Sequence, residues 1–199
     1  MKKISFLLAM ILSFSVLVSF AATAGSTLRL IKASGSVNTS EIGGRGLYVF
    51  SLWGERATSG VKEDGSFATE ISSSRPQKLS VKDDQGMTRA LAIVLPKNAE
   101  QIVFDARSTA AALLFQDQNS FRSSQAAQDL LTTMAQHQSF QELVSFLKKK
   151  LIVHSLEALV DDSECIALLE TCNDVIFQEN TPAVRKALYE AKDRLEQDL

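Results

Sequence analysis

The spacing of apolar residues changes once along this chain, near residue 106. Before that point, short runs rich in Val, Ile, Leu and Phe are separated by Gly, Ser and Asp at intervals of about ten residues, as expected for short β-strands. After it, the apolar residues recur at helical spacing. A chain with strands first and helices afterwards belongs to the α+β class. We therefore expect a small antiparallel β-sandwich over residues 25–105, followed by a short-helix bundle within residues 106–199.

One segment of the first half, Leu47–Trp53, is apolar at both odd and even positions. This pattern predicts a central strand that is buried on both faces of its sheet. Its aromatic residues Tyr48, Phe50 and Trp53 would then belong to the core. In the alternative, one face of the strand meets solvent and the aromatic rings form a surface that could bind carbohydrate.

The pair Asp64-Gly65 predicts a two-residue hairpin turn, because the central positions of such a turn need positive φ angles. After the turn, Phe67, Thr69 and Ile71 alternate with other residues, as they would along a strand with one buried face. We therefore expect a hairpin centred on this pair.

Residues that can cap a helix N-terminus precede the apolar runs of the second half. They are Ser108-Thr109, the capping-box sequence Ser139-Phe140-Gln141-Glu142, Asp162-Ser163, and Thr181-Pro182. The last of these opens a helix that continues to Leu199 with a narrow apolar stripe. This helix is either a free amphipathic end or the start of a further domain in a longer chain.

Residues 1–24 have the order of a secretory signal peptide. Two lysines precede the apolar run Ile4–Phe20, and small residues follow up to Ala24-Gly25, where we expect cleavage. The alternative is an uncleaved membrane anchor, since the run is close to the lower length limit for a span of about 17 residues. We expect a bacterial protein of the periplasm or the extracellular space, with no transmembrane segment after the signal is removed.

The charge balance argues against nucleic acid as a partner. The chain carries 21 Lys and Arg against 23 Asp and Glu, for a net charge of −2, and loss of the signal peptide removes two more lysines. A mildly acidic chain lacks the basic surface that nucleic-acid binding requires. The expected partner is another component of the cell envelope or the extracellular space, and the sequence leaves the oligomeric state open.

The two cysteines, Cys165 and Cys172, leave two arrangements open. Export permits a disulfide. On one continuous helix, however, the two residues lie about 10.5 Å apart along the axis, beyond the limit of about 7 Å between the Cα atoms of a bridged pair. A disulfide therefore needs a turn between them, and the alternative is two buried thiols. Two cysteines and two distant histidines have no metal-ligand spacing, so no metal or cofactor is expected.

Few residues can perform catalysis. His137 lies in a polar connector and is expected at the surface, whereas His154 lies in an apolar run and is expected to be buried or partly buried. The paired acids Asp161 and Asp162 are expected to cap a helix. No Gly-x-Ser-x-Gly elbow and no phosphate-binding glycine loop is present. No catalytic residue is therefore assigned, and an enzyme would have to use His154 with Asp161 or Asp162.

Ser34-Gly35-Ser36-Val37, followed by the apolar strand and then Asp64-Gly65-Ser66-Phe67, resembles the transthyretin-like module, also called the carboxypeptidase regulatory-like domain. Gly43-Gly44-Arg45-Gly46 replaces the Pro-x-x-Gly-Ala element usual in that family. The join from Asp105 to Leu113 is similar to uncharacterised exported bacterial proteins in which a sandwich leads into a Ser-Thr-Ala helix. The resemblance implies a β-sandwich within residues 27–105 and, because members of the module family are generally non-catalytic, no enzymatic activity.

Together these patterns predict an exported, non-catalytic binding or interaction protein whose ligand the sequence does not specify. One alternative is an envelope-associated hydrolase or accessory enzyme that uses His154 and a nearby acid. The other is an N-terminal structural segment of a longer exported protein.

Overall fold

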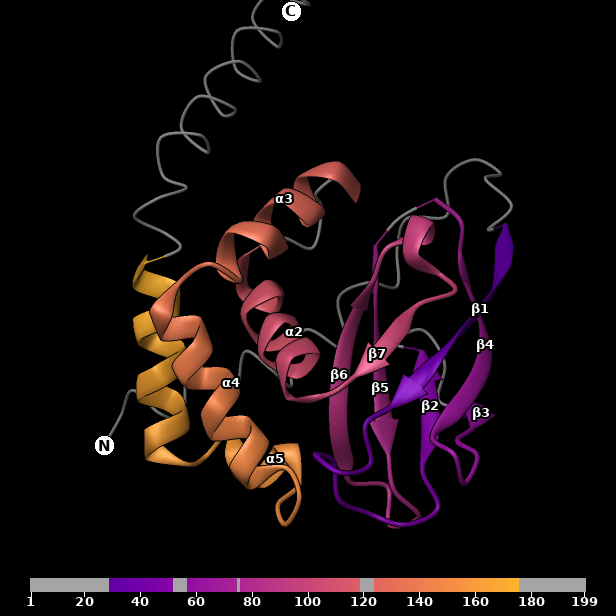
Figure 1. Cartoon of the computed structure of the whole chain (residues 1–199), viewed down its shortest axis with the longest axis horizontal. Helices are drawn as coiled ribbons and strands as arrows, with labels where there is room; N and C mark the ends of the chain where they lie inside the picture. The colour runs from indigo at the N-terminus through magenta and orange to yellow at the C-terminus, as the bar shows by residue number, and fades with distance from the viewer. Residues whose placement is uncertain (1–28, 52–56, 75, 119–123, 176–199) are drawn as a thin grey trace, which may run out of the picture.

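The computed structural model describes residues 29–51, 57–74, 76–118 and 124–175 (Figure 1). In these ranges the chain has an α+β fold, as expected, with two β-sheets and a group of helices along one side of them. The signal peptide, its cleavage site at Ala24-Gly25, Trp53 and the helix expected from Thr181-Pro182 lie outside the described residues.

The strands are β1 (Leu30–Val37), β2 (Tyr48–Ser51), β3 (Ala57–Gly60), β4 (Ser66–Ser72), β5 (Gln77–Lys82), β6 (Thr88–Val94) and β7 (Ile102–Phe104). The first sheet has the order β4-β1-β7 and the second the order β3-β2-β5-β6. All neighbouring strands are antiparallel except β1 and β7, which run parallel. This pair departs from the antiparallel arrangement we expected, because the chain crosses from β6 in one sheet to β7 in the other through a short 3-10 helix, η1 (Pro96–Asn98).

The two sheets enclose a common apolar core, which we call the sandwich core. Its residues come from both sheets, from the loop after β1 and from the connection between β6 and β7. They are Ala33, Val37, Ile42, Leu47, Val49, Phe67, Ile71, Leu79, Val81, Ala90, Ala92, Val94, Ala99, Ile102 and Phe104. Phe67 and Ile71 are buried together with Thr69, which confirms the alternation predicted for this strand.

Four helices follow the sandwich: α2 (Ala106–Gln118), α3 (Ser124–Met134), α4 (Gln138–Lys150) and α5 (Leu156–Leu159). Residues 163–175 form a further helix beside α4. These elements share a second core, the helical core, with one strand of the sandwich. Its buried residues are Leu91, Leu95, Ala106, Ala110, Ala112, Leu114, Phe115, Met134, Phe140, Leu143, Phe146, Leu147, Leu151, Leu156, Leu159, Cys165 and Cys172.

Strand β6 has buried apolar residues on both faces. Ala90, Ala92 and Val94 belong to the sandwich core, whereas Leu91 belongs to the helical core, because α2 packs against the outer face of β6. We expected this role for Leu47–Trp53, and that prediction is wrong. Strand β2 is central in its sheet, but none of the described helices covers its outer face, where Tyr48 is 43% exposed.

The turn at Asp64-Gly65 forms, but it does not join neighbouring strands of one sheet. Gly65 has a φ of 81° and donates its N–H to the carbonyl of Lys62 at 2.9 Å. Strand β3 before the turn pairs with β2, while β4 after it pairs with β1 in the other sheet. The hairpin prediction was wrong because an Asp-Gly pair specifies the local backbone, whereas the pairing of the strands depends on which sheet buries each apolar face.

Two of the predicted caps also differ. Asp105 caps α2: its carboxylate accepts the N–H of Ser108 at 2.6 Å, and Ser108 Oγ accepts the N–H of Asp105 at 2.9 Å. Helix α4 begins after His137 without a side-chain cap, so the predicted capping box at Ser139 does not form. The cap at Asp162 is confirmed, because its carboxylate accepts the N–H of Glu164 at 2.9 Å.

Candidate functional site

The loop between β1 and β2 contacts the helices directly. Its Gly43 donates its N–H to the carbonyl of Leu151 at 3.0 Å. A Cβ atom on Gly43 would lie 1.8 Å from the carbonyl oxygen of Ile152, so only glycine allows the two backbones to approach this closely. The preceding Ile42 is buried in the sandwich core. The loop therefore connects the sandwich core directly to the turn between α4 and α5.

Glu41 in the same loop joins two helix ends. One carboxylate oxygen lies 2.9 Å from Lys148 Nζ near the end of α4, and the other accepts the N–H of Ala106 at the start of α2 at 3.3 Å. The hydrogen bond from Lys148, assisted by that from Ala106, lowers the pKa of Glu41 despite its partial burial. The carboxylate is thus held in its charged form, and its negative charge stabilises the N-terminus of α2.

A second carboxylate, that of Asp83, orders the β5–β6 turn, which is bonded to the same loop. Asp83 is buried and accepts hydrogen bonds from Arg89 Nε at 2.7 Å and from the N–H groups of Gln85 and Met87 at 3.0 and 2.9 Å. Burial alone would raise the pKa of Asp83, but these bonds outweigh it and the pKa is lowered. The N–H of the next residue, Asp84, bonds to a carbonyl of the glycine loop. The β5–β6 turn is thereby fixed to the loop.

Helix α5 attaches to the beginning of β6. The carboxylate of Glu157 accepts the N–H of Thr88 at 3.0 Å. Desolvation alone would raise the pKa of Glu157. The hydrogen bonds from Thr88, from its own backbone and from Ser155 outweigh this effect, so the pKa is lowered. With the contacts of Gly43 and Glu41, this bond fixes the connection between α4 and α5 against the sandwich at both of its ends.

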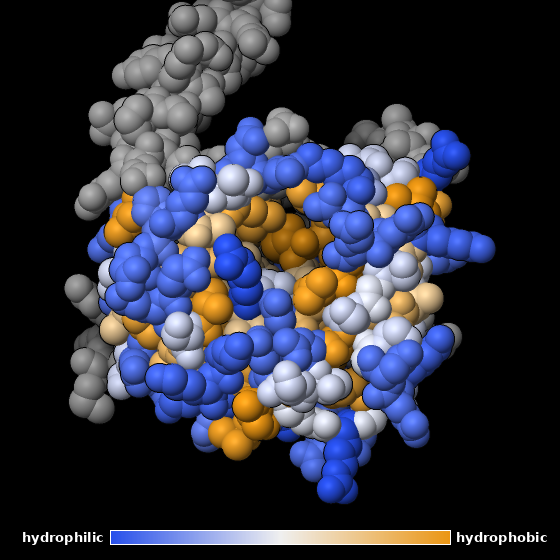
Figure 2. Space-filling view, in the orientation of Figure 1, coloured by the Kyte–Doolittle hydropathy of each residue, from blue (hydrophilic) through white to orange (hydrophobic). Residues whose placement is uncertain are grey.

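The turn held in this way exposes two large apolar side chains. Ile152 is 48% exposed and Val153 is 68% exposed. The backbone between the helices is ordered by hydrogen bonds from the N–H groups of Val153 and His154 to the carbonyl of Lys150, at 3.1 and 2.9 Å. Figure 2 shows apolar side chains at the lower end of the molecule, in the region where Figure 1 places the connection between α4 and α5. We call residues 151–154 the junction turn.

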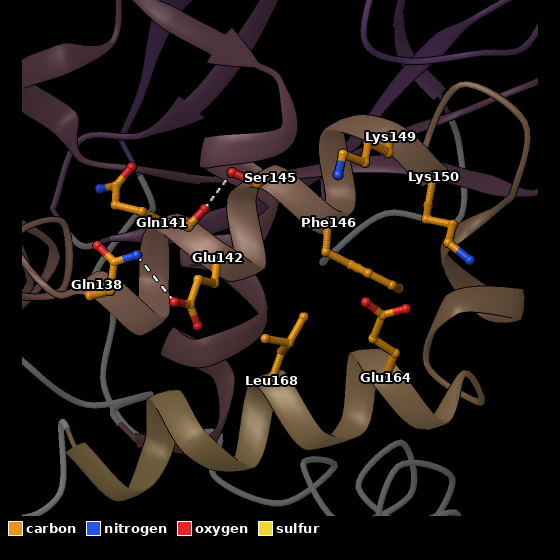
Figure 3. Close-up of a pocket in the computed structure, with 9 residues that line it drawn as sticks. All are labelled: Gln138, Gln141, Glu142, Ser145, Phe146, Lys149, Lys150, Glu164 and Leu168. Carbon is orange, nitrogen blue, oxygen red and sulfur yellow. Dashed lines mark hydrogen bonds between the residues drawn. The ribbon is translucent and has the colours of Figure 1, made fainter.

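A groove of about 600 Å³ lies between α4 and the helix 163–175 (Figure 3). Its lining residues are Gln138, Gln141, Glu142, Ser145, Phe146, Lys149, Lys150, Glu164 and Leu168. Several of its polar groups are partnered: Gln138 bonds to Glu142 at 3.1 Å, and Lys150 Nζ lies 3.6 Å from Asp162 and 5.3 Å from the ring centre of Phe146. Its described lining contains no histidine and no cysteine, and its one hydroxyl, that of Ser145, donates to the carbonyl of Gln141 at 2.8 Å.

The histidine of the catalytic alternative lies in a different place from the one expected. His154 is exposed in the junction turn, because the apolar run around it leaves the helix after Lys150 and turns at the surface. Among the interactions of the described residues, none joins His154 to Asp161 or Asp162. Asp162 instead caps the next helix. His137 is half-buried at the start of α4.

Both cysteines are free and buried. They lie on the one helix formed by residues 163–175, so the turn that a Cys165–Cys172 bridge requires is absent and the alternative of buried thiols holds. Burial, followed by the charges of Asp162 and Glu164, raises the pKa of Cys165 to about 11. Desolvation likewise raises the pKa of Cys172. The protonated thiols act as small apolar groups of the helical core.

We expected the aromatic residues of β2 to lie in the sandwich core, but the structure places them outside it. Tyr48 is exposed and Phe50 is half-buried, and Lys82 Nζ lies 5.4 Å from the ring centre of Phe50. Only Val49 of this strand points between the sheets with full burial. The outer face of β2 is therefore a mixed aromatic and basic surface.

Within the described ranges, no group of three His, Cys, Asp or Glu side chains is arranged to hold a metal ion. None of the described helices combines the length and the apolar composition needed to cross a bilayer. No family model, no curated protein and no solved structure matches this chain.

Proposed function

We propose that this chain is an exported, non-catalytic interaction protein that binds another component of the cell envelope or the extracellular space through the junction turn. The observation that carries the proposal is the exposure of Ile152 and Val153 on a backbone that is held in place. A rigid turn loses little conformational entropy on binding. Two adjacent apolar side chains, projected from such a turn, can bury apolar surface in a partner at low entropic cost.

The number of contacts that hold the junction turn in place supports a role in binding. Gly43 bonds to Leu151 and Glu41 to Lys148, and Glu157 just after the turn bonds to Thr88 of β6. Several interactions therefore fix a surface whose apolar tip is exposed to solvent. Packing alone would place the tip residues inside, where burial is favourable. Their exposure is better explained by a partner that covers them.

The residues near the turn support the non-catalytic part of the proposal. The hydrolase alternative requires His154 to lie within hydrogen-bond reach of an acid. Among the described side chains, the exposed His154 has no such acid. The resemblance to the transthyretin-like module supports the same conclusion. Export to the periplasm or beyond remains part of the proposal, since it depends on the signal peptide predicted from residues 1–24.

The test compares capture of envelope and culture-fluid components by immobilised mature protein and by two double variants. Ile152→Ser with Val153→Ser removes the apolar tip. Leu30→Ser with Val103→Ser is the matched control, because these side chains are 55% and 45% exposed on the first sheet. We expect the wild type and the control to retain the same component, identified by mass spectrometry, and the junction variant to lose it. Equal retention by all three proteins would refute the proposal.

A further inference from the structure

Three of the four edge strands of the sandwich are closed by a recognisable device, as edges in natural proteins usually are. On β6, the N–H of Leu91 bonds to Thr109 Oγ1 at 3.2 Å, and its carbonyl accepts a hydrogen bond from Ser108 Oγ at 3.0 Å. Glu157 accepts the N–H of Thr88 on the same strand. Strand β7 has only three residues. Strand β3 has four, and its register with β2 is irregular.

Strand β4 is different. It has seven residues and contains no proline. Its register with β1 is continuous from Leu30 opposite Ser72 to Ser36 opposite Ser66. It lies on the side of the sandwich away from the helices (Figure 1). This strand is a long and regular edge.

The pairing with β1 shows which backbone groups of β4 point outward. Ser73 donates its N–H to the carbonyl of Arg29, and Val37 donates its N–H to the carbonyl of Gly65. The odd-numbered residues of β4 therefore bond to β1. Because successive residues of a strand point their N–H and C=O groups to opposite sides, the groups of the even-numbered residues face the open edge.

Most of one end of this edge is already occupied. Ser66 donates its N–H to the carboxylate of Asp64, and its carbonyl accepts the N–H of Lys62, both at 2.9 Å. The outward backbone groups of Ala68 and Glu70 have no partner in the part of the chain that the structure describes, and both residues are exposed. Ser72, the remaining even-numbered residue of β4, is only 5% exposed, so the accessible free edge consists of Ala68 and Glu70.

Thr69 lies between them and points into the sandwich. It is only 7% exposed, and its hydroxyl has no hydrogen-bond partner. Buried hydroxyls in folded proteins are almost always hydrogen-bonded. The Thr69 hydroxyl is thus a buried polar group without a partner beside the open edge, enclosed by the sandwich of its own copy.

We propose that two copies of the chain pair antiparallel through β4, with Thr69 of each copy on the two-fold axis. In this register Ala68 of one copy faces Glu70 of the other, so their outward N–H and C=O groups bond to each other on both sides of the axis. The two Thr69 side chains form a non-hydrogen-bonded pair, the position at which cross-strand side chains are closest. The first sheet then continues as β7-β1-β4-β4-β1-β7.

The neighbouring registers are disfavoured by the same residues. A two-fold axis at Glu70 would place two carboxylates directly opposite each other, which destabilises a strand pair. An axis at Ala68 would require the backbone groups of Ser66, which are already bonded within the turn. The axis at Thr69 uses only free groups. This surface is separate from the junction turn, so the dimer and the proposed function stand or fall independently.

Single cysteines test both the pairing and its register in the full mature chain. We expect Thr69→Cys to give a covalent dimer under mild oxidation, seen on a non-reducing gel, because the two sulfurs meet on the axis. Ala68→Cys and Glu70→Cys should stay largely monomeric alone but should cross-link when the two variants are mixed. The wild type, whose two cysteines are buried, is the background control. A Thr69→Cys chain that remains monomeric, or an Ala68→Cys chain that cross-links with itself as well as Thr69→Cys does, would overturn the proposal.

Ala68→Pro provides a second measurement without a cysteine. Proline removes one outward N–H but is tolerated on an edge strand, whereas Ala68→Ser keeps the N–H and serves as the matched control. By sedimentation equilibrium we expect wild type and Ala68→Ser to dimerise alike, and Ala68→Pro to raise the dissociation constant by at least about tenfold. Circular dichroism checks that the variants are folded, and if Ala68→Pro does not fold, the cysteine series decides. A wild type that is monomeric at every concentration would refute the dimer.

Discussion

At the scale of single residues, Asp83 shows how a buried charge supports the surface above it. Its side chain is 2% exposed, and Arg89 beside it is 15% exposed. The carboxylate is satisfied by one guanidinium and two backbone N–H groups, which is the condition under which a buried ion pair is tolerated. The β5–β6 turn that it orders is bonded to the glycine loop, and this loop in turn carries the junction turn.

The lowered pKa of Asp83 predicts a pH dependence of stability. A carboxyl whose pKa is lower in the folded state stabilises the protein above its unfolded pKa of about 3.9 and loses that contribution as the pH falls through the folded value. We expect Asp83→Asn to reduce the free energy of unfolding at neutral pH by about 3 kcal/mol, because it leaves Arg89 unpaired. Urea unfolding between about pH 7 and 3 should then show a smaller acid loss than in the wild type.

The matched control for this measurement is Glu63→Gln, at an exposed carboxylate of a surface turn. It should leave both the stability at neutral pH and the loss at acid pH close to those of the wild type. If Asp83→Asn kept the full acid loss, the buried carboxyl would not be the group that titrates.

At the scale of elements, the contact between α2 and β6 explains why an edge strand can lie in the middle of the molecule. Ser108 and Thr109 in the first turn of the helix bond to the backbone of Leu91, and Thr109 also donates to the carbonyl of Asp105 at 2.8 Å. These hydroxyls take the place of a neighbouring strand. The helix therefore covers the outer face of β6 and closes its edge at once.

Thr109→Val tests this role, since it replaces the hydroxyl by a methyl group of similar size at a fully buried position. The N–H of Leu91 then loses its partner, and we expect the free energy of unfolding to fall by about 1–3 kcal/mol. Chemical denaturation measures the change. Thr132→Val is the control: that hydroxyl is exposed and bonds only to Gln128 of its own helix, so its loss should cost no more than about 0.5 kcal/mol. Equal effects of the two substitutions would contradict the role assigned to Thr109.

The same contact marks the limit of prediction from sequence. The alternation along Phe67, Thr69 and Ile71 and the cap at Asp162 are local patterns, and both are confirmed. Ser108 and Thr109 have the residue types of a cap, but Asp105 caps α2 instead, and both hydroxyls bond to a strand that is distant in sequence. Which strand is covered on both faces depends on helix packing, which no window of residues contains.

The candidate site was still less accessible from sequence. His154 was expected to be buried because its neighbours are apolar, but the helix ends at Lys150 and the turn brings His154 to the surface. Gly43, which contacts the backbone of this turn, precedes it by more than a hundred residues. A glycine is required there because the two backbones approach too closely for a Cβ atom. A glycine-rich loop in sequence indicates freedom of the backbone, whereas here it permits close packing.

At the scale of the whole molecule, the two cores share one strand. Alternate residues of β6 enter the sandwich core and the helical core, so the loss of one core removes a covering layer from the other. Glu41 and Glu157 add bonds between the two parts. A division of the chain at residue 105 follows the change of secondary structure, and this arrangement predicts that the parts on either side of it unfold together.

Hydrogen exchange on two core variants tests this coupling. Leu143→Ala opens a cavity in the helical core and Val81→Ala opens one in the sandwich core, both at fully buried positions. We expect Leu143→Ala to cost about 2–5 kcal/mol and to accelerate exchange of the slowest amides in β1 and β5 as much as those in α4, since both exchange through one global opening. Val81→Ala should act reciprocally on α4. If each variant accelerated only the amides of its own part, the sandwich and the helices would be independent domains, and β6 would be stable without the helix that covers it.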